Sequence, residues 1–146
     1  MPDEVEPIAD NELLYRRVPA SASTGWFDPV SRVLRPEAFG PHRQRDVTGI
    51  SVTRARYKSI AEAARGQPGK SYFVAVLCVG DLRQANYIVK PQPNVPGGYD
   101  ISHAELPDLN AANYKASETL ERQRELAERL CLRVEGPFQD GAAISP

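Results

Sequence analysis

The stretch from Ala64 to Ser71 carries the residue types of a phosphate-binding loop. It reads A-R-G-Q-P-G-K-S and ends in Lys70 and Ser71, which satisfies a relaxed form of the glycine-rich nucleotide-binding pattern. Such a loop follows a strand and opens a helix, because backbone N–H groups and the helix dipole must converge on the phosphate. Here the sequence predicts a helix before the stretch and a strand after it. We therefore interpret the stretch as a turn rather than as a nucleotide site.

A second chemical signal is the H-A-E tripeptide of His103, Ala104 and Glu105. It resembles the tripeptide of zinc-dependent nucleoside and nucleobase deaminases, in which the histidine binds metal and the glutamate carries protons. Those enzymes also need a nearby cysteine pair of the P-C-x-x-C type, whereas Cys78 lies upstream and Cys131 stands alone in L-C-L. Because too few zinc ligands remain, we predict no metal site and no cofactor.

A third constellation joins Arg16 or Arg17 to the Ser-Val-Thr stretch that begins at Ser51 and to Glu105. This order resembles that of ADP-ribosyltransferase-like enzymes. The resemblance implies an NAD-using enzyme in which the arginine holds the dinucleotide phosphates, the serine strand braces the site and the glutamate orients the ribose. The chain departs from the pattern at His103, where many such enzymes have Glu. The alternative is that Arg17 and Glu105 are surface residues on neighbouring strands that form an ordinary ion pair.

A nucleophile paired with a histidine is formally possible, because the chain holds His42 and His103. No G-x-S-x-G motif occurs, however, and neither cysteine is expected in an exposed, electropositive setting. We interpret His42 as an exposed loop residue and His103 as a half-buried strand residue.

Charge is spread unevenly along a chain whose net charge is -1. Between residues 32 and 70 there are nine Lys and Arg but only three Asp and Glu, whereas the first twelve residues hold five acids and no base. Such an asymmetry indicates either an anionic partner for the basic half or an acidic segment that covers it.

The leading hypothesis is a non-catalytic binding or accessory module that contacts a protein partner or an anionic ligand. Aromatic and arginine residues are typical of binding hot spots, and they gather in the loop before residue 45 and in the basic strand that follows. The candidate binding residues are Trp26, Phe39, Arg43, Arg45, Arg54, Arg56 and Lys58. The alternative is that the aromatic side chains cover the sheet. Nucleic-acid binding is a further alternative, but no known motif appears and the isoelectric point is about 6.1.

The elements that must position these residues follow from hydrophobic periodicity. Alternating or short apolar runs bounded by Pro and Gly predict strands over 12–18, 49–54, 72–79, 87–90, 101–106 and 132–135. A capping box formed by Ser59 and Glu62 predicts a helix over 59–66, and one or two helical turns are expected over 81–86. The clearest helix spans 116–131, with Leu120, Ala127, Leu130 and Cys131 on one face. On its other faces, Glu118 with Arg122 and Glu125 with Arg129 are predicted i,i+4 ion pairs.

These elements predict an α+β fold with a single mixed, mostly antiparallel sheet covered by two main helices, 59–66 and 116–131. We expect a poorly ordered acidic lead-in over 1–11, a single domain over 12–138 and a frayed tail over 139–146. No apolar run is long enough to span a bilayer, and the acidic N-terminus is unlike a secretory signal. The sequence thus predicts a cytoplasmic protein with reduced thiols and no membrane partner.

Overall fold

The computed structural model describes residues 5–21 and 25–143. Its strands are β1 (Leu13–Pro19), β2 (Phe27–Asp28), β3 (Val33–Leu34), β4 (Ile50–Arg54), β5 (Ser71–Cys78), β6 (Lys90–Pro91), β7 (Asn94–Val95), β8 (Gly98–Tyr99), β9 (His103–Leu106), β10 (Cys131–Gln139) and β11 (Ala142–Ala143). Its α-helices are α1 (Ile60–Ala63), α2 (Val79–Gln84) and α3 (Ser117–Glu125), accompanied by the 3-10 helices η1 (Pro36–Phe39) and η2 (Ala111–Asn113) and the π-helix η3 (Leu126–Leu130).

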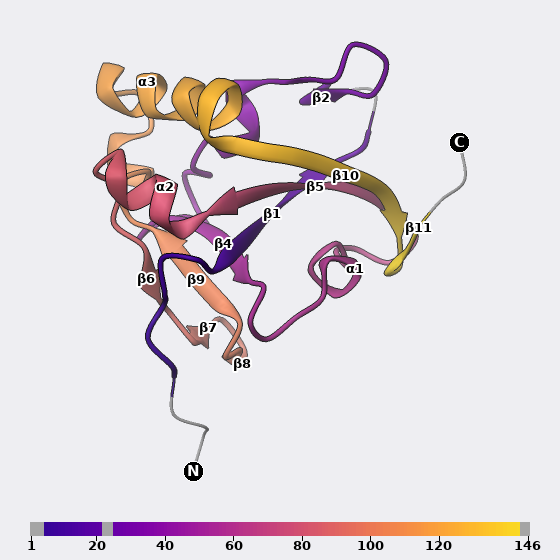
Figure 1. The fold of residues 1–146 in the computed structure, drawn as a ribbon, viewed down its shortest axis with the longest axis horizontal. Helices are drawn as coiled ribbons and strands as arrows, with labels where there is room; N and C mark the ends of the chain where they lie inside the picture. Colours follow the sequence, from indigo (N-terminus) through magenta and orange to yellow (C-terminus); the bar gives the residue numbers. More distant parts are fainter. Residues whose placement is uncertain (1–4, 22–24, 144–146) are drawn as a thin grey trace.

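Seven of the strands form one sheet in the order β11-β10-β5-β1-β4-β9-β6 (Figure 1). The predicted α+β class is confirmed, but every pairing in this sheet is antiparallel, so the sheet is not mixed. The reason lies in the place of β1, which pairs antiparallel with both β4 and β5. Those two strands therefore run parallel to each other without ever being neighbours.

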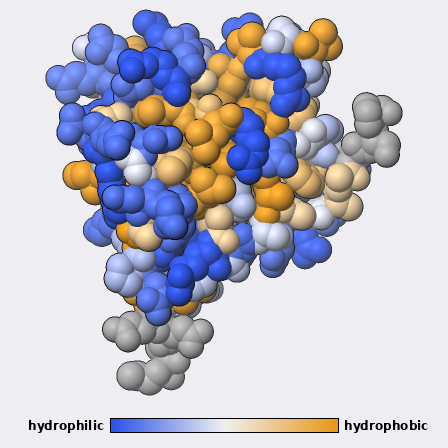
Figure 2. Space-filling view, viewed as in Figure 1, coloured by the Kyte–Doolittle hydropathy of each residue, from blue (hydrophilic) through white to orange (hydrophobic). Residues whose placement is uncertain are grey.

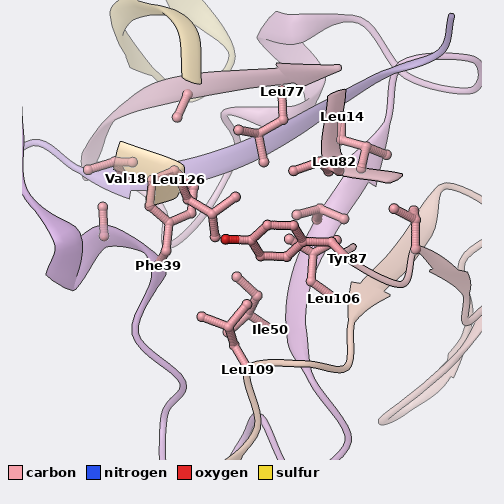
Figure 3. Packing of buried hydrophobic residues seen from close by; sticks show 14 of the residues in the cluster. Leu14, Val18, Phe39, Ile50, Leu77, Leu82, Tyr87, Leu106, Leu109 and Leu126 are labelled. Carbon is pink, nitrogen blue, oxygen red and sulfur yellow. The ribbon is translucent and has the colours of Figure 1, made fainter. Parts of the chain in front are cut away.

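The two faces of the sheet differ in chemistry. In β4, Ile50 and Val52 are buried in the main core, whereas Ser51 and Thr53 point to the opposite face and are only half-buried. Leu14, Leu106 and Leu126 meet on the core face together with Phe39 and Tyr87 (Figure 3). A smaller apolar cluster around Ala64, Val74 and Phe138 lies on the other face, where α1 packs against β1.

The first predicted helix is present but short. Its capping box is confirmed, because the Glu62 backbone N–H donates to the Ser59 hydroxyl at 3.1 Å and the Ser59 N–H donates to the Glu62 carboxylate at 3.1 Å. The helix ends at Ala63, three residues before the predicted end. The chain then passes so close to Tyr72 that a side chain at Gly66 would lie 2.4 Å from its ring.

The second predicted helix corresponds to α3 and η3, but the face assigned to its N-terminal half is wrong. Leu120 is 49% exposed, and Thr119, Gln123 and Leu126 are buried instead. α3 packs against η1, and the Gln123 carboxamide lies against Gly40 at the end of that helix. A polar side chain, that of Gln123, is therefore buried where α3 meets the end of η1.

Strand bounds differ most from the prediction at β6 and β10. β6 includes only Lys90 and Pro91, because Tyr87 and Val89 leave the sheet and enter the core. β10, in contrast, continues to Gln139, four residues beyond the predicted end. Its register shifts between Glu135 and Phe138, which lets the strand pass Pro137 despite the missing N–H.

The two ends of the described chain contact the sheet. In the predicted lead-in, Ile8 is 6% exposed and belongs to the main core, and the Asp10 carbonyl accepts from the Gly80 N–H at 2.7 Å. In the predicted tail, Ala142 and Ala143 pair with β10 as β11. Residues 1–4 and 144–146 of these two predictions lie outside the described residues.

Within the described part of the chain, no helix is both long enough and apolar enough to cross a membrane. On the face drawn in Figure 2, hydrophilic side chains gather over α3 and α2, whereas hydrophobic ones cross the middle, over β10 and β5. Leu132 on β10 is 49% exposed.

Candidate functional site

The structure brings together two members of the ADP-ribosyltransferase-like constellation. Ser51 in β4 and Glu105 in β9 are direct partners across an antiparallel pair, so their side chains share one face of the sheet. Arg16 reaches this pair only through the backbone, because its guanidinium donates to the Ser51 carbonyl at 2.8 Å and to the Ala38 carbonyl at 3.0 Å. Burial lowers the pKa of Arg16, although the charge of Asp46 opposes that effect.

Arg17 is directed elsewhere. Its side chain is exposed, its guanidinium carbon lies 5.1 Å from the centre of the Tyr72 ring, and it donates a hydrogen bond to the Arg65 carbonyl. Glu105 is 8% exposed and accepts a 2.7 Å hydrogen bond from the Thr48 hydroxyl. The structure therefore places Arg17 beside α1 and Glu105 beside the start of β4, and it shows no ion pair between them within the described residues.

His103 has a neighbour that the sequence did not reveal. Its Nε2 lies 3.0 Å from the Ser51 hydroxyl, and its Nδ1 lies 2.6 Å from the carbonyl oxygen of Gln92. Both side chains are half-buried. The alternating patterns of residues 49–54 and 101–106 place each of these two side chains on the polar face of its strand. Their contact depends on the register in which the two strands pair, and the sequence of one strand alone does not determine that register.

The aromatic residues of the predicted binding loop belong to the core. Phe39 is completely buried and lies beside Val18 and Leu126 (Figure 3). Trp26 is half-buried and packs against the same cluster. The structure thus matches the alternative in which these rings cover the sheet, and neither gives an exposed anchor to the arginines nearby.

The basic residues of β4 and the turn after it are divided between interior and surface. Arg54 is completely buried, and its guanidinium forms two hydrogen bonds of 2.7 and 2.8 Å with the Glu12 carboxylate. These bonds are the main reason why the pKa of Arg54 is raised. Arg56 is exposed above the Tyr57 ring, and Lys58 forms a 3.3 Å ion pair with Asp100.

Two loops bring cations to one tyrosine that the sequence did not single out. The Arg43 guanidinium carbon and the Lys115 ammonium each lie 5.5 Å from the centre of the Tyr114 ring. Arg43 also approaches the Tyr114 hydroxyl at 3.4 Å. Burial acts to raise the pKa of Tyr114, but hydrogen bonds from Arg43 and Lys115, together with their charges, outweigh it and lower that pKa. We call Arg43, Tyr114 and Lys115 the cationic tyrosine patch.

Asp46 holds the first of these loops in shape and ties it to the second. Its carboxylate accepts a 2.7 Å hydrogen bond from the His42 N–H, and its carbonyl accepts from the Ala111 N–H at 2.9 Å. Asn110 caps η2 through hydrogen bonds from the N–H groups of Ala112 and Asn113. Backbone contacts therefore fix the two loops beside each other, and Tyr114 directly follows the capped helix.

The remaining sequence signals lie apart from these clusters. The phosphate-loop-like stretch forms the predicted turn between α1 and β5, and its Gly69 N–H donates to the Asp140 carboxylate at 3.0 Å. Burial raises the pKa of the Cys131 thiol, which disfavours a reactive thiolate. Two hollows of about 460 and 230 Å³ lie along α3, and neither is lined by Ser51, His103 or Tyr114.

Among the residues that the structure describes, no three His, Cys, Asp or Glu side chains are grouped so that they could hold a metal ion. Comparisons with protein families, with curated proteins and with solved structures found no match to this chain.

Proposed function

We propose that this protein is a binding module that takes an acidic segment of a protein partner at the cationic tyrosine patch. The observation that carries the proposal is the convergence of Arg43 and Lys115 on Tyr114 from two loops. Arg43 and Lys115 are exposed, and Tyr114 is half-buried. An aromatic ring held between cations offers an acidic peptide both apolar contact and charge.

The chemistry of the patch favours carboxylates. A guanidinium presents a planar fork of donors that matches a carboxylate, and tyrosine and arginine are the residues on which binding energy concentrates. Arg45 adds a further exposed guanidinium on the same loop. Asp46 is the acid nearest in sequence to Arg43 and Arg45. Its carboxylate accepts a hydrogen bond from the His42 N–H, which leaves these two arginines available to a ligand.

The charge of the whole chain favours a protein partner over a nucleic acid. Nucleic-acid binding draws much of its affinity from many Lys and Arg contacts to phosphates, which release condensed counterions. This chain has a net charge of -1 and so lacks the overall positive charge on which such binding draws. A local patch of this size suits a short acidic segment.

Fluorescence anisotropy with a labelled ten-residue polyglutamate peptide tests the proposal. We expect binding that weakens between 50 and 200 mM salt, and a loss of at least about tenfold in affinity for Arg43→Ala and for Tyr114→Ala. Arg56→Ala is the matched control, because Arg56 is also an exposed arginine above a tyrosine ring. It should leave the affinity within about twofold.

Equal losses in Arg56→Ala and Arg43→Ala would mean unspecific attraction and would overturn the assignment of the patch. Absence of peptide binding at low salt would overturn the acidic-partner proposal itself. Tighter binding of a single-stranded oligonucleotide of equal charge, with the same dependence on Tyr114, would move the assignment to nucleic acid.

A further inference from the structure

The face of β4 and β9 opposite the main core carries a row of polar side chains that the proposed binding function does not use. Ser51 and Thr53 point to this face from β4, and His103 and Glu105 point to it from β9. The core side of the same strands is apolar, with Val52 and Ala104 buried. Hydroxyl, imidazole and carboxyl groups thus share one face of the sheet.

The hydrogen bonds of His103 assign its protons. A backbone carbonyl can only accept, so the 2.6 Å contact to Gln92 places a hydrogen on Nδ1. In the neutral imidazole Nε2 is then an acceptor, and the Ser51 hydroxyl donates to it across 3.0 Å. A serine hydroxyl bonded to a basic ring nitrogen, whose other nitrogen is oriented by a third group, is the arrangement of an activated nucleophile.

We propose that Ser51 is a nucleophile and His103 its general base, and that together they transfer an acyl group from a carboxylic ester. Ser51 Oγ attacks the ester carbonyl carbon while its proton passes to His103 Nε2. The bond from that carbon to the alcohol oxygen breaks, and the leaving alcohol takes the proton from Nε2. Water then attacks the acyl-serine and gives a proton to Nε2. The carboxylic acid leaves, and the proton returns to Oγ.

The surroundings of the pair support this role. Both side chains are half-buried, so neither is fully enclosed by the protein. Glu105 is held by Thr48 rather than by His103, which leaves the Gln92 carbonyl as the group that orients the ring. Lys90 lies directly opposite Glu105 at the outer strand and brings a cation to the same face, in register with Ser51.

A fluorophosphonate probe and p-nitrophenyl acetate test the proposal on the intact protein. We expect stoichiometric labelling that peptide mapping places on Ser51, and a burst of p-nitrophenol as the acyl-serine forms. Ser51→Ala should abolish both signals. His103→Ala should slow labelling by about 10²-fold or more, which is the usual contribution of a general base. Thr53→Ala is the matched control, because Thr53 is a hydroxyl on the same strand and face, and it should label like the wild type.

A second variant keeps the test valid if Ser51→Ala does not fold. In Ser51→Cys the thiol should react with iodoacetamide, and the additional change His103→Ala should slow that reaction at least about tenfold. Thermal unfolding of each variant establishes that it is folded. The proposal is overturned if the folded wild type is not labelled at Ser51, or if His103→Ala reacts as fast as the wild type. Because Ser51 and His103 are not members of the cationic tyrosine patch, failure here leaves the binding proposal standing, and the reverse also holds.

Discussion

Arg54 is the largest of the fully buried side chains in the described structure. Its guanidinium meets the Glu12 carboxylate and also donates to the carbonyl oxygens of Glu6 and Pro7, at 2.8 and 3.4 Å. The Tyr57 ring lies 5.0 Å from it. A buried charge is tolerated only when it is paired and its hydrogen-bonding groups are satisfied. Arg54 therefore fastens the segment before β1 to the sheet.

Replacing Arg54 by Ala should strongly destabilise the protein. The change leaves Glu12 with an uncompensated, largely buried charge, which typically costs about 3–5 kcal/mol of unfolding free energy. Urea denaturation followed by circular dichroism measures this loss. Arg56→Ala, at an exposed position two residues away, should stay within about 0.5 kcal/mol of the wild type. Similar midpoints for the two variants would contradict a structural role for Arg54.

Residue types alone predict only part of the candidate sites. The alternation that places Ile50 and Val52 inside also places Arg54 inside, but a charged residue is normally assigned to the surface. Its partner Glu12 is 42 residues away, so the pairing has no local signal. The same limit applies to Ser51 and His103. The types of both were visible in the sequence, whereas their 3.0 Å contact depends on a strand register set by the whole sheet.

The helical segment of α3 and η3 was likewise only partly predictable from the sequence. Its existence followed from its composition and i,i+4 charge pairs, and one predicted pair is present, with Glu125 and Arg129 at 3.8 Å. Its buried face was mispredicted because hydrophobicity was taken as the only guide. Gln123 is buried beside Gly40 at the end of η1, and Leu120 is left at the surface.

Two leucines on this helical segment should therefore respond differently to truncation. Leu126 is fully buried, so Leu126→Ala removes apolar contacts and opens a cavity, at a cost of about 2–5 kcal/mol. Leu120 is 49% exposed, and Leu120→Ala should cost no more than about 0.5 kcal/mol. Urea midpoints of the two variants measure the difference. A larger loss for Leu120 would mean that the helix buries the face predicted from the sequence.

At the scale of the whole molecule, Tyr87 links stability to alkaline pH. Its ring lies inside the main core (Figure 3). Its hydroxyl donates to the Glu125 carboxylate at 2.7 Å. Burial raises the pKa of Tyr87 far above its ordinary value, and the bond to Glu125 adds to the shift. The folded state therefore keeps a proton that the unfolded chain releases near pH 10.

The pH dependence of the unfolding free energy tests this role of Tyr87. The contribution of Tyr87 is fully present below pH 10, the approximate pKa in the unfolded chain, and is lost as pH rises toward the higher folded pKa. Above pH 10 the unfolding free energy of the wild type should fall by about 1.4 kcal/mol per pH unit more steeply than that of Tyr87→Phe. Urea titrations between pH 8 and 11 measure both slopes. Equal slopes for the two proteins would contradict the linkage.

The outer edge of β10 affects whether these molecules associate through their strands at high concentration. β11 covers this strand only at Phe138 and Gln139. Farther along, the Arg32 guanidinium already donates to the Val134 carbonyl at 2.7 Å, and Pro137 offers no N–H. A strand from a second molecule would meet an interrupted row of backbone hydrogen-bonding groups on this side of β10. Fibril-like growth by edge-to-edge addition therefore has no continuous template along this border.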